Sequence, residues 1–147
     1  MSEELIQRDL INAPEKMGVW NYYNIGATSL KALRAAKIIP NHDYTEYENK
    51  KPDVIVTHGK QVIAIVEYKV PQKLRTKKQI QDAIEQELGT AQILEAKIYV
   101  VTDGTKTFWI NPKTGNSIVD QNGINVTVEF NRKSSNTINV MSKILTS

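Results

Sequence analysis

The sequence contains no cysteine among its 147 residues, which excludes a disulfide framework and a thiolate metal site. It has no apolar run long enough to cross a bilayer. Its first residues, Met-Ser-Glu-Glu-Leu, are acidic where a signal peptide would be basic. Repeats, low-complexity tracts, domain linkers and a P-loop string are also absent. These absences predict a single domain over residues 1–147, located in the cytoplasm and without a membrane partner.

The most informative stretch is residues 51–69, in which two apolar segments are joined at His58-Gly59-Lys60. This pattern predicts a β-hairpin whose ends carry Asp53, Glu67 and Lys69. An acid at the end of the run Val-Ile-Ala-Ile-Val-Glu is costly to bury unless it is paired or binds a metal. Because side chains alternate along a strand, Glu67 and Lys69 project to the same side. Two carboxylates and an amine are the groups that metal-assisted hydrolysis requires.

The length of the turn decides whether Asp53 can join this group. A two-residue turn at Gly59-Lys60 would place Asp53 opposite Val66, facing away from Glu67. A three-residue turn that includes His58 would place it on the same face as Glu67. A catalytic role therefore predicts the longer turn or a bulge. In the non-catalytic alternative, Asp53 caps a turn after Pro52, and Glu67 forms a structural ion pair with Lys69.

The same residues carry a resemblance to a known family. Pro52-Asp53 followed by Glu67-Tyr68-Lys69 resembles the PD-(D/E)xK nuclease signature, and the fuller hairpin is similar to the N-terminal domain of type I restriction enzyme R subunits. Residues 83–86 and 96–104 are similar to the next helix and strand of that family. The resemblance covers roughly residues 28–112.

The resemblance implies an α/β fold with a restriction-endonuclease-like core, a mixed central β-sheet flanked by helices. It also implies a Mg²⁺-dependent DNA endonuclease, with Mn²⁺ as a possible substitute. Asp53, Glu67 and the Tyr68 carbonyl would be metal ligands, and Lys69 would orient the attacking water and stabilise the phosphate. Gln86 resembles the family's helix glutamine, although Thr90 stands where a tyrosine usually follows it.

Partners follow from the same resemblance. The domain would cut double-stranded DNA, and modification and specificity subunits of a restriction complex would supply sequence recognition. ATP would serve only a motor domain beyond residue 147, since the sequence is expected to be an N-terminal fragment of a longer chain. The alternative is a catalytically inactive DNA-binding or docking module of the same fold, attached to a DNA methyltransferase or helicase.

A basic segment follows the hairpin directly. Between residues 68 and 81 there are five basic side chains and no acidic one. Beyond Lys69, these are Lys73, Arg75, Lys77 and Lys78, which we expect to bind nucleic acid. A solvated loop and helix start would look the same. The net charge of +3 permits nucleic-acid binding but does not require it.

Hydrophobic spacing predicts the remaining elements. Residues 12–27 have no clear period. Helices are expected at 2–11, at 30–39 after an N-cap at 27–29, at 76–94 and near the C-terminus. Further strands are expected at 43–48, 97–102, 107–110 and 124–130.

Overall fold

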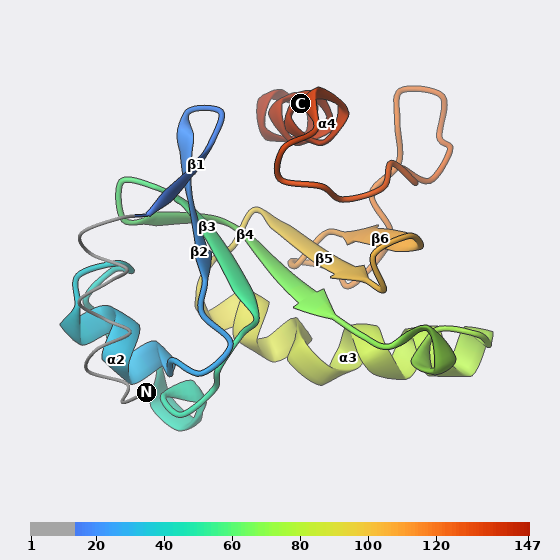
Figure 1. The fold of residues 1–147 in the computed structure, drawn as a ribbon. Coiled ribbons are helices and arrows are strands. Elements are labelled where there is room, and N and C mark those ends of the chain that lie inside the picture. Colours follow the sequence, from blue (N-terminus) through green and yellow to red (C-terminus); the bar gives the residue numbers. More distant parts are fainter. Residues whose placement is uncertain (1–13) are drawn as a thin grey trace.

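The computed structural model describes residues 14–147, which form a mixed α/β fold around one six-stranded sheet (Figure 1). The strands follow chain order across the sheet. Neighbouring strands are antiparallel except β4 and β5, which are parallel. The elements are β1 (Glu15–Met17), β2 (Trp20–Asn24), α2 (Leu30–Ala35), the 3₁₀ helix η1 (Thr45–Tyr47), β3 (Val54–His58), β4 (Gln61–Tyr68), the 3₁₀ helix η2 (Pro71–Lys73), α3 (Lys77–Ile93), β5 (Ile98–Thr102), β6 (Thr107–Ile110) and α4 (Ser135–Thr146).

Helices cover both faces of the sheet. Helices α2 and α3 lie on one side and α4 on the other (Figure 1). Each face has its own apolar cluster, with Ile65 of β4 in the cluster under α2 and α3 and Val66 in the cluster under α4. Both residues are fully buried. Strand β4 is therefore a central strand covered on both sides, as its continuous apolar run predicts.

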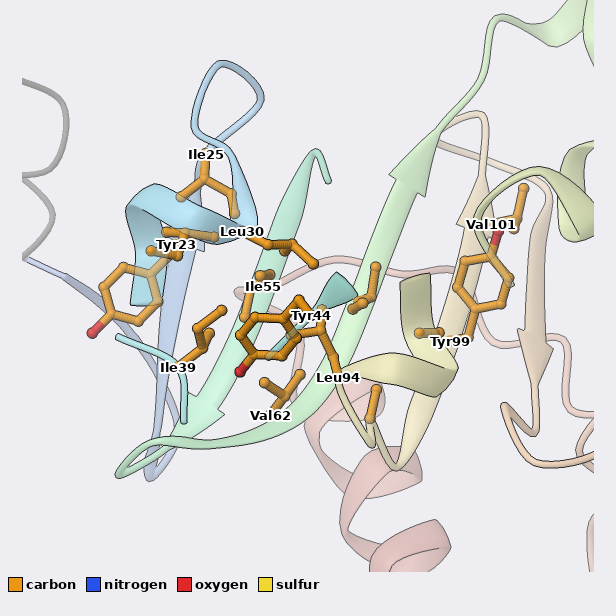
Figure 2. Packing of buried hydrophobic residues seen from close by; sticks show 14 of the residues in the cluster. Tyr23, Ile25, Leu30, Ile39, Tyr44, Ile55, Val62, Leu94, Tyr99 and Val101 are labelled. Carbon is orange, nitrogen blue, oxygen red and sulfur yellow. The ribbon is translucent and has the colours of Figure 1, made fainter. Parts of the chain in front are cut away.

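The cluster under α2 and α3 fixes the position of α3. Figure 2 shows Leu94, the residue just after α3, packed near Val62 of β4 and Tyr44 of the segment before β3. The buried Tyr99 of β5 donates a hydrogen bond from its hydroxyl to the Ile84 carbonyl of α3, at 3.0 Å. These contacts hold α3 against β5 and the neighbouring part of the sheet.

Helix α3 begins and ends close to its predicted limits. Thr76 and Gln79 form a capping box, with the Gln79 N–H donating to Thr76 Oγ1 at 3.1 Å and the Thr76 N–H donating to Gln79 Oε1 at 3.2 Å. Gly89 does not interrupt the helix. Instead it lets the ring of Tyr47 from η1 approach closely, because a Cβ at Gly89 would lie 2.9 Å from Tyr47 Cζ.

This close approach reverses the usual effect of replacing a helical glycine. In an open helix, Gly→Ala stabilises by about 1 kcal/mol. We expect Gly89→Ala to lower the free energy of unfolding by about 1–2 kcal/mol, because Tyr47 must leave its packed position. Denaturant unfolding would measure this effect. In a Tyr47→Ala background the same substitution should be stabilising; destabilisation in both backgrounds would contradict the contact.

The strand predicted at 43–48 is wrong. Tyr44 is buried and Tyr47 partly buried in the cluster under α2 and α3, and a spacing of three residues suits the 3₁₀ helix η1 rather than an alternating strand. Thr45 has a positive φ of 55°, and its N–H is bound by Asp43 Oδ1 at 2.8 Å. This local turn chemistry opposes an extended backbone.

The sheet is instead extended beyond β3 by two antiparallel strands, β2 and then β1, which come from residues 12–27. β1 and β2 are three and five residues long and are joined through Gly18, which has a φ of +60°. Segments this short show no period in the sequence. The strand predicted at 124–130 is also wrong, because this segment makes only the isolated bridge between Val119 and Asn125.

The other predicted elements agree with the structure in part. The helix expected at 30–39 is capped by Ser29 but ends at Ala35, and Lys37 then adopts a positive φ of 63°. The strands β5 and β6 and the C-terminal helix α4 lie where they were expected. The helix predicted at 2–11 lies outside the described residues. Within 14–147, no helix combines the length and apolarity that crossing a membrane requires.

Candidate metal and phosphate site at the end of β4

A β-bulge brings Asp53 and Glu67 to one face. His58 pairs with Gln61, so the turn contains only Gly59 and Lys60. The register then shifts, because Thr57 pairs with Val62 whereas Val56 pairs with Ala64. Ile63 is the extra residue. Of the two predicted alternatives, a longer turn or a bulge, the structure shows the bulge.

After the bulge, Val54 pairs with Val66, which places Asp53 opposite Glu67. The Asp53 N–H donates to Glu67 Oε1 at 3.4 Å, and the Tyr68 N–H donates to Asp53 Oδ2 at 2.8 Å. The structure therefore brings the two acids into direct contact.

The electrostatics of this pair are unfavourable without a cation. Glu67 is 6% exposed, and its pKa is raised to about 8 mainly by burial, together with repulsion by Asp53 and Glu87. None of the four ion pairs within residues 14–147 involves Asp53 or Glu67. The structural ion pair between Glu67 and Lys69 is therefore not formed.

Lys69 binds a different partner. Its Nζ donates to Oε1 of Gln86, from the middle of α3, and its backbone N–H donates to the Thr102 carbonyl of β5 at 2.9 Å. The predicted site residues Lys69 and Gln86 are thus brought together beside Glu67. Within an extended strand, the N–H and C=O of one residue point to the same neighbour. The carbonyl of Tyr68 is therefore directed, like its N–H, towards the Asp53 side of β4.

Glu87 is a site residue that the sequence did not reveal. Its side chain is only 16% exposed, pairs with Lys50 Nζ at 3.4 Å and accepts a hydrogen bond from the Thr90 hydroxyl at 2.9 Å. Lys50 belongs to the loop that carries Asp53, so this ion pair ties that loop to α3. Thr90 is buried and orients Glu87. The only signal in the sequence was the spacing of three residues between Glu87 and Thr90.

This arrangement predicts a shift in the titration of Glu67. Because the charge of Glu87 helps to raise the pKa of Glu67, Glu87→Gln should lower it while keeping an acceptor for Thr90. Carbon-detected NMR titration of the Glu67 carboxyl would measure the change. Glu85→Gln is the control, since Glu85 is exposed on α3. Equal shifts in both variants would contradict a local effect of Glu87.

The predicted basic segment is only partly joined to the carboxyl pair. Lys73 lines an open groove of about 670 Å³ together with Tyr68, Lys69 and Gln86. The same groove also contains the acidic side chains of Asp82 and Glu85.

The other three basic residues, Arg75, Lys77 and Lys78, are exposed but are not among the residues that line the groove. Lys78 pairs with Asp82 at 3.5 Å.

A larger cavity of about 1040 Å³ lies at the other end of β4. It is lined by Gln61 and Ile63 of that strand, together with Trp20 and Leu145. Neither Asp53 nor Glu67 borders it. Across residues 14–147 there is also no group of three or more His, Asp or Glu side chains arranged to hold an ion. The carboxyl pair at the end of β4 is therefore the candidate that the chemistry supports.

Comparison with known proteins gives no match: no family model, curated protein or solved structure matches this chain.

Proposed function

We propose that this chain is a divalent-cation-dependent DNA endonuclease domain, similar to the nuclease domain of type I restriction enzyme R subunits. The observation that carries the proposal is the bulged register of β3 and β4, which sets Asp53 beside Glu67. Lys69 lies two residues after Glu67 and projects to the same face. The strand order adds support, since three antiparallel strands, a helix and a parallel strand are consistent with a restriction-endonuclease-like core.

The residues present fit a Mg²⁺ or Mn²⁺ ion. Both cations prefer hard oxygen ligands, commonly one or two carboxylates plus substrate phosphate oxygens. Asp53 and Glu67 would supply the carboxylates, and the carbonyl of Tyr68 is directed to the same side. Two acids in contact, with no basic partner among the described ion pairs, form a site whose charge a cation would balance. When bound, the ion would neutralise charge on the phosphate and favour ionisation of water.

Side chains of this protein would stabilise the phosphate and position the ligands. The ammonium of Lys69 would stabilise negative charge that develops on the phosphate, and Gln86 would hold that ammonium at the end of β4. Asp53 would keep its orientation through the Tyr68 N–H. Glu67 would have to release its proton before it could act as a ligand, because its pKa is raised to about 8.

The substrate would be held mainly by its phosphates. Lys73, in the same groove as Lys69, would contact a phosphate next to the cut, while Arg75, Lys77 and Lys78 would contact the backbone further away. Such contacts position DNA without reading its sequence. We propose that modification and specificity subunits supply that recognition, and that ATP is used by a motor domain outside these residues.

Incubation with supercoiled plasmid tests the proposal. We expect nicked and linear products with Mg²⁺ or Mn²⁺ and none with EDTA. Intact plasmid under all of these conditions would contradict an active nuclease.

A non-catalytic DNA-binding or docking module of the same fold is the second candidate. It is favoured because, within residues 14–147, Asp53 and Glu67 are not joined by a third His, Asp or Glu side chain in a group that could hold a metal ion. This candidate predicts DNA retention that is sensitive to salt, independent of metal and not accompanied by cleavage.

A further inference from the structure

Tyr68 presents an aromatic ring to solvent at the end of β4, on the face of the strand opposite to the Glu67 side chain. Its side chain is 44% exposed, and it is the only Tyr, Trp or Phe in residues 14–147 that is classed as exposed rather than buried or half-buried. Val70, two residues further on, is 57% exposed. The strand that carries Glu67 thus ends in an apolar patch, although every other aromatic side chain of the described region is at least partly covered.

Tyr68 is held at its backbone and lies near Tyr22. Its N–H donates to Asp53 Oδ2 at 2.8 Å, and its side chain lies close enough to Tyr22 to help raise the pKa of the Tyr22 hydroxyl. Tyr22 is itself fixed, because it is buried and the guanidinium of Arg132 lies 5.4 Å from its ring centre. Arg132 in turn pairs with Glu15 at 2.9 Å. A ring that is already ordered loses little conformational entropy when it binds a flat ligand.

The surroundings of the ring suit a nucleotide. Tyr68 borders the groove that contains Lys69 and Lys73. Because side chains alternate along a strand, its ring projects from the face of β4 opposite to Lys69, so an aromatic surface and two ammonium groups lie on the two sides of the strand's end. Proteins that bind single-stranded nucleic acid combine these two features: bases stack on aromatic rings while basic groups follow the phosphates. A base within a duplex has both faces covered by its neighbours, so the ring can stack only on an unpaired or terminal base.

We propose that Tyr68 is a stacking platform for an unpaired DNA base whose neighbouring phosphate lies in the groove of Lys69 and Lys73. This inference rests on the proposed function and narrows its substrate from DNA in general to DNA with a single-stranded segment at the site. The duplex on either side would be bound by the exposed basic residues.

Fluorescence anisotropy in EDTA tests the inference without requiring cleavage. The probes are a fluorescein-labelled oligothymidylate and a blunt duplex of equal length. We expect Tyr68→Leu to weaken binding of the single strand about tenfold. Tyr68→Phe, which keeps the ring and loses the hydroxyl, should bind within about twofold of the unchanged protein. Duplex affinity should change little in either variant, and Val119→Ala, which shortens an exposed apolar side chain elsewhere, is the control.

Three results would overturn the inference: unchanged single-strand affinity in Tyr68→Leu, an equal loss in Tyr68→Phe, or an equal loss for the duplex. Thermal unfolding of each variant would confirm that the fold is retained. Plasmid cleavage without a Tyr68 effect on single-strand affinity would refute only the stacking role. A Tyr68 effect without metal-dependent cleavage would refute the nuclease proposal and keep the stacking role.

Discussion

Asp53→Asn should reduce metal-dependent plasmid cleavage by about a hundredfold to a thousandfold or more. The substitution keeps the size of the side chain and an oxygen that can accept the Tyr68 N–H. It removes the charge that, with Glu67, would bind the cation. Lys69→Met should cause a similar loss, because it removes the ammonium beside the phosphate while keeping most of the apolar stem. Initial rates of nicking at saturating Mg²⁺ would measure both effects.

Two matched variants control for a general effect of charge. Glu46→Gln removes an exposed carboxylate of η1, and Lys60→Met removes an exposed ammonium from the turn at the far end of β4. Both should cleave plasmid at nearly the original rate. Activity that survives Asp53→Asn or Lys69→Met, or that falls equally in the controls, would place the chemistry elsewhere on the molecule.

Glu67→Gln should abolish cleavage and yet stabilise the protein at alkaline pH. The pKa of Glu67 is raised from 4.5 to about 8 in the folded state, so the folded protein holds a proton that the unfolded chain releases. The free energy of unfolding should therefore fall as pH rises from about 4.5 to 8, and should then stay constant. At about 1.36 kcal/mol for each pKa unit, the loss is on the order of 5 kcal/mol.

The glutamine variant has no proton to lose at this position. Its stability should be close to that of the unchanged protein below pH 4.5, and it should exceed it increasingly up to pH 8. Denaturant unfolding across this pH range would give the difference between the two proteins, in which the other titrating groups largely cancel. A difference that does not depend on pH would show that Glu67 titrates normally.

The hairpin was the part of the site that the sequence could predict. The acids and the amine lie at the ends of apolar runs, and the alternation of side chains reduced the question to whether the turn is long or bulged. The bulge itself at Ile63 could not be located, because the apolar residues on both sides of it fit either face of a covered strand. Its position depends on which of these side chains pack into the cluster under α2 and α3 and which pack into the cluster under α4.

Residues that act through tertiary contacts could not be predicted. Lys50 and Glu87 are 37 positions apart and meet only because α3 packs across the loop before β3. The side chains of Tyr22 and Tyr68 interact across the sheet. The sequence did not predict β2, because the strand is only five residues long. The aromatic spacing of Tyr44 and Tyr47 was misread as a strand, since β propensity says little where a local turn decides the backbone.

Calorimetric titration with Mn²⁺ tests the shared cation site most directly, because it requires neither DNA nor activity. Above pH 8, where Glu67 is ionised, the account predicts saturable binding that is lost in both Asp53→Asn and Glu67→Gln and kept in Glu46→Gln. Binding that persists unchanged in either of the first two variants would show that these carboxylates do not hold the ion together.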